Sequence, residues 1–141
     1  MIEIGIIGVM AGVNPKPDIV RTDLEAHDHA MSIPISQVVS ELTDLLGATS
    51  VAVIGGVQET RAVHQWMTGR EPQRPNALRF ALQLATMVST LAHREIAKAW
   101  FHGSNPRLND QIPMLLLRDP EISASMRAEL LDAARAFSTR S

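Results

Sequence analysis

Residues 99–108 read Ala-Trp-Phe-His-Gly-Ser-Asn-Pro-Arg-Leu, and residues 113–117 read Pro-Met-Leu-Leu-Leu. A helical pattern ends here in an aromatic pair, because Gly103 favours a helix C-terminus and Pro106 cannot continue a helix. A short apolar helix is expected at 113–117. The stretch therefore predicts a fixed corner between helices, and its residue types indicate binding of a partner rather than a reaction.

Longer helices are predicted on both sides of this corner. Apolar residues recur at helical spacing from Asn76 to Phe101 and occupy more than one face, which predicts a long, extensively buried central helix. A break near Ala92-His93 is an alternative. Asp119-Pro120-Glu121 is a typical start for a final helix. The positions expected to be buried are Leu78, Phe80, Ala81, Leu82, Leu84, Ala85, Met87, Val88, Leu91 and Ala92 before the corner, and Ile122, Met126, Leu130, Ala133, Ala134 and Phe137 after it.

Shorter helices are predicted upstream of the central helix. Ser36 is the expected N-cap of a helix that ends at Gly47, where glycine suits the C-terminal cap. Ser50 is the expected N-cap of a second helix over 51–54.

A turn at Gly55-Gly56 then leads into a third helix from Val57 to Met67. The segment 51–56, Val-Ala-Val-Ile-Gly-Gly, also resembles the first strand and glycine turn of a nucleotide-binding unit. Its glycine fingerprint is incomplete and no later strands follow to build a sheet. The helical interpretation is therefore preferred.

Together these elements predict an all-α fold in three parts. Residues 1–34 are an N-terminal extension expected to be peripheral, with a short strand or an adhering arm at 1–13. Residues 35–80 are expected to form a helix-turn-helix module. Residues 81–141 are expected to form a second, small helical module, and the two modules share the long central helix.

The composition is that of a globular protein with an uneven charge distribution. The chain has 141 residues, no cysteine and a formal net charge of −2. Residues 57–107 carry seven basic and three acidic side chains, whereas residues 1–56 carry two basic and seven acidic ones. A surface that faces DNA is thus expected only in the middle of the chain. The absence of cysteine fits the cytoplasm, and we expect no export signal and no membrane span.

The segment 51–69 has the pattern of a helix-turn-helix, in which the second helix enters the major groove of DNA. Val57, Val63 and Trp66 or Met67 are expected to pack inward. A plain helical hairpin with solvated polar residues is the alternative. Glutamine and arginine suit contacts with base edges, and further arginines suit phosphates. The candidate DNA-binding residues are Gln58, Thr60, Arg61, His64, Gln65, Arg70 and Arg74, with Arg79 as a further phosphate contact.

Two segments of the chain resemble antitoxins of the Xre/MbcA/ParS group. The first is 56–69, Gly-Val-Gln-Glu-Thr-Arg-Ala-Val-His-Gln-Trp-Met-Thr-Gly, followed by Pro72. The second is Trp100-Phe101, then Ser104-Asn105-Pro106 and Leu108, then Pro113 and the leucines after it. The resemblance as a whole covers roughly residues 35–137, about three quarters of the chain.

The resemblance implies a function that needs no chemistry from this chain. Such antitoxins join an Xre-like helix-turn-helix domain to a toxin-binding domain that covers the active-site cleft of a toxin encoded beside them. That toxin is often a RES-domain enzyme that consumes NAD⁺. The helix-turn-helix half is expected to form a homodimer and to bind the promoter DNA of the operon.

The toxin contacts expected from this comparison lie in the corner and the last helix. Aromatic and arginine side chains are typical anchors of protein interfaces. A core position is the alternative for Trp100, and a solvated tail is the alternative for the C-terminal residues. The candidate toxin-binding residues are Trp100, Phe101, Asn105, Arg107, Leu108, Arg135, Phe137 and Arg140.

No catalytic or metal site is expected. His27-Asp28-His29 offers too few ligands for a metal, and neither His93 nor His102 has a Cys or Ser neighbour that suggests nucleophilic catalysis. We therefore expect no cofactor, no metal and no enzymatic activity. The competing interpretation is a stand-alone helix-turn-helix regulator whose C-terminal half only dimerises.

Overall fold

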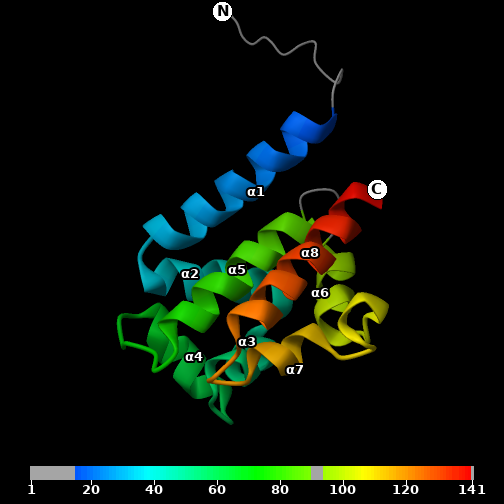
Figure 1. Cartoon of the computed structure of the whole chain (residues 1–141). Helices are drawn as coiled ribbons and strands as arrows, with labels where there is room; N and C mark the ends of the chain where they lie inside the picture. The colour runs from blue at the N-terminus through cyan, green and yellow to red at the C-terminus, as the bar shows by residue number, and fades with distance from the viewer. Residues whose placement is uncertain (1–14, 90–93, 141) are drawn as a thin grey trace, which may run out of the picture.

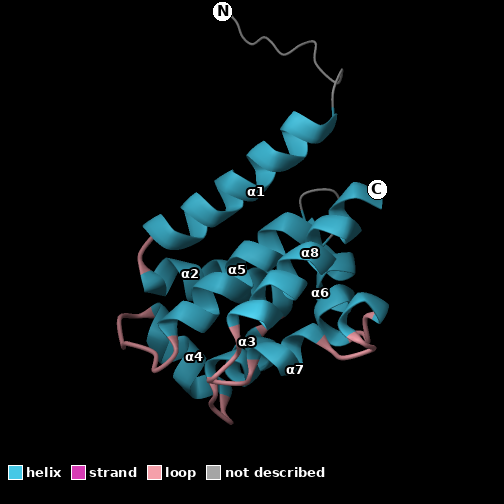
Figure 2. Ribbon diagram, viewed as in Figure 1, coloured by secondary structure: helices cyan, strands magenta, loops and turns pink. Residues whose placement is uncertain are grey.

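The structure, a computed structural model, describes residues 15–89 and 94–140. All regular structure in these ranges is helical, without a strand, which confirms the predicted all-α fold (Figures 1 and 2). None of the helices in the described ranges is long and apolar enough to cross a membrane. The elements are α1 (Pro15–Ser32), α2 (Ile35–Leu46), α3 (Ala48–Gly55), α4 (Thr60–Met67), α5 (Pro75–Ser89), α6 (Arg94–His102), the 3₁₀ turn η1 (Pro106–Leu108), α7 (Pro113–Leu117) and α8 (Ala124–Arg140).

The helix α5 lies at the centre of the molecule. It contacts α1, α2, α3, α6 and α8, which surround it (Figure 1). Its predicted apolar residues from Leu78 to Val88 are all buried, as expected for a helix covered on several sides. They belong to one continuous core, which also includes Ala26 of α1, Val38 of α2 and Leu130 of α8.

Residues 76–101 do not form the single long helix that the sequence predicts. The chain forms two helices, α5 and α6, which pack against each other. The alternative break near Ala92-His93 and the predicted core residues Leu91 and Ala92 lie outside the described residues. The apolar pattern was correct for each helix separately, because periodicity alone does not indicate where a chain reverses direction.

The corner after α6 is present and is closed by hydrogen bonds. The side-chain Oδ1 of Asn105 accepts the N–H of Arg107 at 2.9 Å, and the Asn105 N–H donates to the Gln111 carbonyl at 3.0 Å. The short turn η1 and then α7 follow, the latter over the predicted residues 113–117. The corner thus has a defined shape and contacts α8 through η1.

Several helix boundaries differ from the prediction because backbone and neighbouring elements replace the expected side-chain caps. Pro34 precedes α2, so Ser36 is not its N-cap, whereas Gly47 ends this helix as predicted. Ser50 lies inside α3 and is buried. Val57 belongs to the turn before α4, and its N–H donates to the Ala52 carbonyl at 2.9 Å.

The final helix also begins later than predicted. Asp119 Oδ1 accepts the N–H of Glu121 at 2.9 Å and so forms a local turn instead of a helix cap. Ser123 provides the cap, since its Oγ accepts the N–H of Met126 at 3.0 Å. The predicted stripe is confirmed at Leu130, Ala133 and Ala134, which are buried, while Ile122, Met126 and Phe137 are partly buried.

The helix α1 was not predicted, although residues 1–34 were expected to be peripheral. It packs on α5 through Ala26 and Ala30, which are 2% and 0% exposed. Arg79 of α5 donates to the carbonyl oxygens of Ala30 and Ile33 at 2.8 and 2.7 Å and thereby satisfies the C-terminal end of α1. Residues 1–13, where a strand or arm was expected, lie outside the described residues.

Candidate protein-binding site

The aromatic pair at the end of α6 belongs to the core. Phe101 is fully buried and Trp100 is 7% exposed, and their rings meet edge to face with centroids 5.1 Å apart. Leu108 of η1 is also fully buried. Phe101 and Leu108 are therefore core residues in this structure, contrary to the expectation that they contact a partner. Trp100 is also mostly buried, in agreement with the alternative that it occupies a core position.

A small hollow of about 230 Å³ lies between the corner and α8. Its walls include Trp100 from the end of α6, Asn105 and Arg107 from the corner, and Phe137 from α8. Arg107 is exposed, and Phe137 is partly buried. Four of the predicted toxin contacts, drawn from two separate segments of the sequence, thus surround one hollow. Packing of η1 against α8 brings the segments together.

The position of Arg107 at this hollow is set by the backbone of the corner. Beside the Asn105 contacts already described, the Asp110 N–H donates to the Asn105 carbonyl at 2.8 Å. Asn109 and Asp110 both have positive φ values, 56° and 63°, a conformation that asparagine and aspartate tolerate better than other non-glycine residues. A tight, hydrogen-bonded loop therefore presents the Arg107 side chain at the surface.

Of the two arginines on α8 that were predicted to contact the toxin, the structure describes the side chain of Arg135 only. The Arg135 Nε donates to Asp23 Oδ2 at 2.6 Å, and its NH1 donates to Asp132 Oδ1 at 2.9 Å. The hydrogen bond to Asp23 is the main reason that the pKa of Arg135 is raised. Arg135 thus connects α8 with α1. Arg140 lies in the last turn of α8, and its side chain is outside the described part of the structure.

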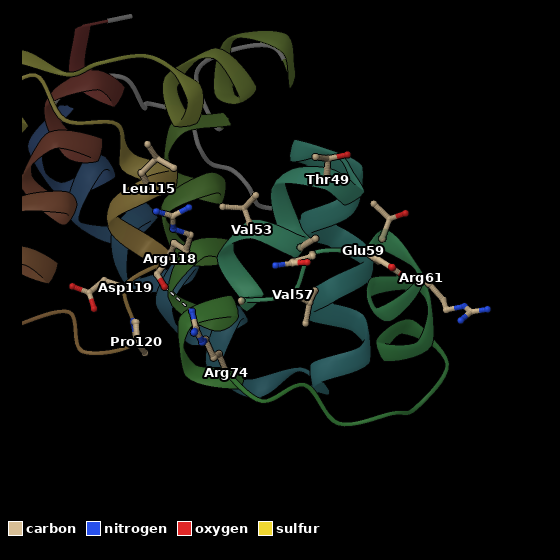
Figure 3. Close-up of a pocket in the computed structure, with 14 residues that line it drawn as sticks. Thr49, Val53, Val57, Glu59, Arg61, Arg74, Leu115, Arg118, Asp119 and Pro120 are labelled. Carbon is tan, nitrogen blue, oxygen red and sulfur yellow. Dashed lines mark hydrogen bonds between the residues drawn. The ribbon is translucent and has the colours of Figure 1, made fainter.

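A larger, open groove of about 1210 Å³ lies at the predicted DNA-binding half. One wall is α3 with the turn before α4, and the other is the end of α7 with the residues that follow it (Figure 3). Arg74 NH1 donates across the base of this groove to the Arg118 carbonyl at 2.6 Å. The same guanidinium covers Gly56, where an added Cβ would lie 2.5 Å from Arg74 Cζ. Arg74 therefore connects the turn to the segment after α7.

The polar face of α4 is oriented largely as predicted. Val63 and Trp66 are buried, while Arg61 and His64 are exposed. Figure 3 shows the Arg61 side chain extending away from the groove. Gln58 is exposed in the turn, and Thr60 is partly buried at the first position of the helix.

The arginines after α4 have other partners. The guanidinium of exposed Arg70 donates to Oε1 of the partly buried Gln65, so these two predicted DNA contacts bind each other. Arg79, expected to neutralise a phosphate, instead binds the end of α1. Of the predicted DNA-binding set, Gln58, Arg61 and His64 are thus the exposed residues for which no side-chain partner is described.

His102 has a serine neighbour that the sequence did not indicate. Ser50 Oγ lies 2.8 Å from His102 Nε2, and His102 Nδ1 lies 2.7 Å from the Lys98 carbonyl oxygen. Because a carbonyl only accepts, Nδ1 carries the proton, and in the neutral ring Ser50 donates to Nε2. Ser50 is only 3% exposed, and its contact with the exposed His102 joins α3 to the end of α6. The two residues are 52 positions apart, and no sequence spacing could have predicted their contact.

The two histidines of the 27–29 segment face different helices. His27 Nδ1 lies 3.3 Å from Gln83 Oε1 of α5, and His29 Nε2 lies 2.6 Å from Glu41 Oε1 of α2. Burial favours a raised pKa at Glu41, but hydrogen bonds from His29 and Gln37 outweigh it and hold the pKa below its ordinary value of 4.5. In residues 15–89 and 94–140, no three His, Asp or Glu side chains are grouped as a metal site. These histidines connect α1 to its neighbours.

Comparison of the chain with protein-family profiles, with curated protein sequences and with solved structures found no match.

Proposed function

We propose that this chain is an antitoxin that acts in the cytoplasm and neutralises a cognate protein toxin by covering its active-site cleft. The observation that carries the proposal is the hollow between the corner and α8, where Trp100, Asn105, Arg107 and Phe137 meet. The resemblance assigned these residues to toxin binding from two segments of the sequence. Their assembly around one surface feature is what a single interface requires.

The chemistry of this surface suits a protein partner. Arg107 is an exposed arginine beside the aromatic side chains of Trp100 and Phe137, and arginine with aromatic residues is enriched in the energetically dominant parts of interfaces. The corner is closed by its own backbone hydrogen bonds, so little conformational entropy is lost when a partner binds it. Steric inhibition of the toxin needs no reacting group on this surface. A RES-domain enzyme that consumes NAD⁺ is the partner that the resemblance suggests.

Co-expression with the product of the adjacent reading frame tests this proposal. We expect the neighbour alone to stop growth, and this chain to restore growth and co-purify with the neighbour as a stable complex. A neighbour that is harmless and forms no complex would contradict the antitoxin function.

Binding to promoter DNA through α4 is a second function that the exposed residues favour. Gln58, Arg61 and His64 are exposed, while Val63 and Trp66 hold the opposite face of the helix in the core. Glutamine and arginine can read base edges in the major groove. The acidic side chains of Glu59, just before α4, and Glu71, in the segment after it, are also exposed, and negative charge near this helix weakens its attraction for phosphates.

The Arg61→Ala variant separates the antitoxin from a stand-alone regulator. Under both functions the variant should lose binding to promoter DNA, measured by a mobility-shift assay at fixed salt. Only the antitoxin should retain toxin neutralisation. Light scattering of the free chain measures whether it forms the proposed homodimer. Loss of neutralisation and DNA binding together in folded Arg61→Ala protein would contradict two separate binding surfaces.

A further inference from the structure

Two exposed apolar side chains share the outer face of α1. Leu24 and Met31 are seven residues apart, which is two helical turns, so they lie on the same face of this helix. Ala26 and Ala30 pack the opposite face on α5. Single exposed apolar residues are common, but two on one helix face form an apolar stripe that another element can cover. The large apolar side chains exposed in the described part of the chain, each between 41% and 59%, are Leu24, Met31, Ile96 and Leu115.

The outer face of α1 is also acidic. Asp28 lies four residues after Leu24 and three before Met31, so its exposed carboxylate is placed between them. Glu25 and His27 are exposed on the two flanks of the stripe, and the described side chains of α1 include no Lys or Arg. A surface that covers this face must therefore combine apolar contact with positive charge.

The open groove between α3 and α7 offers this combination. Val53 of α3, Val57 of the turn after it and Leu115 of α7 form its apolar part. Arg118, just after α7, is exposed, and its guanidinium has no hydrogen-bond or ion-pair partner among the described residues. Figure 3 shows the Arg118 side chain extending toward Leu115. Arginines outnumber acidic residues by three to two in the described walls of the groove, so its charge is opposite to that of α1.

The size of the groove suits a helix better than a small molecule. It measures about 1210 Å³, above the range of about 300–1,000 Å³ that is usual for small-molecule pockets. The stretch from Leu24 to Met31 rises about 10 Å along α1. A groove of this volume can take the side chains of these two helical turns.

The α1 helix that enters the groove must belong to another molecule. Within one chain α1 packs on α5, and Figure 1 shows α1 above α5, with both α3 and α7 below it. The stripe and the groove therefore face away from each other on opposite sides of the same molecule. Each chain has one of each, so two copies can meet with the stripe of one on the groove of the other.

We propose that the outer face of α1 docks in the groove between α3 and α7 of a second copy of this chain. Leu24 and Met31 contact Leu115 and the apolar part of the groove, and Asp28 pairs with Arg118. This one contact covers three of the four exposed large apolar side chains of the described residues. It is head to tail, so a free stripe and a free groove remain for further copies, as in rings and open chains. The association goes beyond the proposed antitoxin function and does not depend on it.

Sedimentation of the full chain between about 10 μM and 1 mM measures this association. We expect the weight-average mass to rise across this range and to exceed two chains, with a weak Kd because the contact is small. Leu24→Ser and Leu115→Ser each remove one exposed side chain of the contact and should weaken the association at least about fivefold. Ile96→Ser is the matched control, since Ile96 is equally exposed but lies on α6 outside both surfaces, and it should leave the Kd unchanged.

A mixture of the two weakened variants distinguishes this contact from a symmetric dimer. Leu24→Ser keeps an intact groove and Leu115→Ser keeps an intact stripe. Mixed in equal amounts, they should form a one-to-one complex with the Kd of the unchanged chain that does not grow further. In a symmetric dimer the same surfaces meet in both copies, so the mixture would associate no better than the average of the two variants.

Charge reversal tests the pairing of the two surfaces. Asp28→Arg and Arg118→Asp should each weaken the association about threefold or more, and the two together in one chain should restore most of it. A mass that does not change with concentration, whether one chain or two, would overturn the head-to-tail contact. So would an effect of Ile96→Ser equal to that of Leu24→Ser, a mixture without the one-to-one complex, or a double reversal as weak as the single ones.

Discussion

The end of α3 lies so close to the indole ring of Trp66 that residue 55 has no room for a side chain. A Cβ added at Gly55 would lie 2.5 Å from the ring atom Cη2 and 2.8 Å from Cζ3. Trp66 is buried and cannot easily move away. We expect Gly55→Ala to lower the free energy of unfolding by about 1–3 kcal/mol, as overpacked substitutions do. Urea denaturation measures this change.

A double-mutant cycle identifies the contact that causes the loss. Phenylalanine lacks the ring atoms that meet the added Cβ, so Gly55→Ala should cost little in a Trp66→Phe background, where the better helix propensity of alanine is also realised. The difference between the two backgrounds should be at least about 1 kcal/mol. If Gly55→Ala cost the same in both backgrounds, contact with the indole ring would not be the reason that residue 55 must be glycine.

For single residues, the sequence predicted which side chains are buried better than which side chains contact each other. The inward positions Val63 and Trp66 follow from helical spacing, and both are buried. The Ser50–His102 pair and the Arg74 bond to the Arg118 carbonyl join residues 52 and 44 positions apart. Helical periodicity describes one element at a time, so it could not pair these residues.

The C-terminal end of α1 is held to α5 by hydrogen bonds from Arg79. Arg79 supplies donors to two carbonyl oxygens at the end of α1, at Ala30 and Ile33. We expect Arg79→Met to keep the aliphatic stem but leave these carbonyls without a donor, at a cost of about 1–3 kcal/mol. Amide hydrogen exchange in residues 23–32 should become at least about fivefold faster, because each 1.4 kcal/mol is a factor of ten.

Arg70→Met is the matched control for this experiment. Arg70 is exposed and its guanidinium binds Gln65, within the same segment of the chain. Exchange in α1 should not change in this variant. If Arg79→Met also leaves α1 exchange unchanged, the two carbonyl contacts do not hold the helix.

The contact of α1 with α2 should weaken in acid. The pKa of Glu41 is lowered in the folded chain, so its carboxylate stabilises the fold fully above the ordinary value of 4.5. This stabilisation is lost as the pH falls through the lower, folded-state pKa. For a partly exposed pair it amounts to less than about 1 kcal/mol.

Urea titrations at successive pH values below 5 measure this loss. Glu41→Gln should remove this part of the acid dependence, whereas Asp44→Asn, an exposed change on the same helix, should retain it. The interpretation is wrong if Glu41→Gln loses stability below pH 4.5 as steeply as the unchanged chain.

Whole helices were predictable where large apolar side chains repeat, as in α5 and α8. The helix α1 was missed because the buried residues among its described side chains, at positions 23–32, are the small Ala26 and Ala30, which give a weak hydrophobic pattern. The single long helix at 76–101 was wrong for the opposite reason. Most residues of α5 are buried and α6 is amphipathic, so apolar residues recur at helical spacing in both helices and the two were predicted as one.

At the scale of the whole molecule, the two candidate surfaces lie on different elements of one continuous core. The hollow involves α6, the corner and α8, whereas the exposed polar face belongs to α4 and the turn before it. A charge reversal on either surface should therefore affect one function and not the other. The all-α class and the corner followed from the sequence, but the assembly of the hollow depends on the packing of η1 on α8.

Growth rescue by two charge-reversal variants tests the central claim most directly. Arg107→Glu and Arg61→Glu each reverse one exposed arginine, so both should fold like the unchanged chain. Each is co-expressed with the adjacent gene product, and growth and co-purification are scored. The account predicts that Arg107→Glu loses at least about tenfold in affinity for the toxin and fails to restore growth, while Arg61→Glu restores it fully. Full rescue by Arg107→Glu, with loss of rescue by Arg61→Glu, would place the toxin on α4 and contradict it.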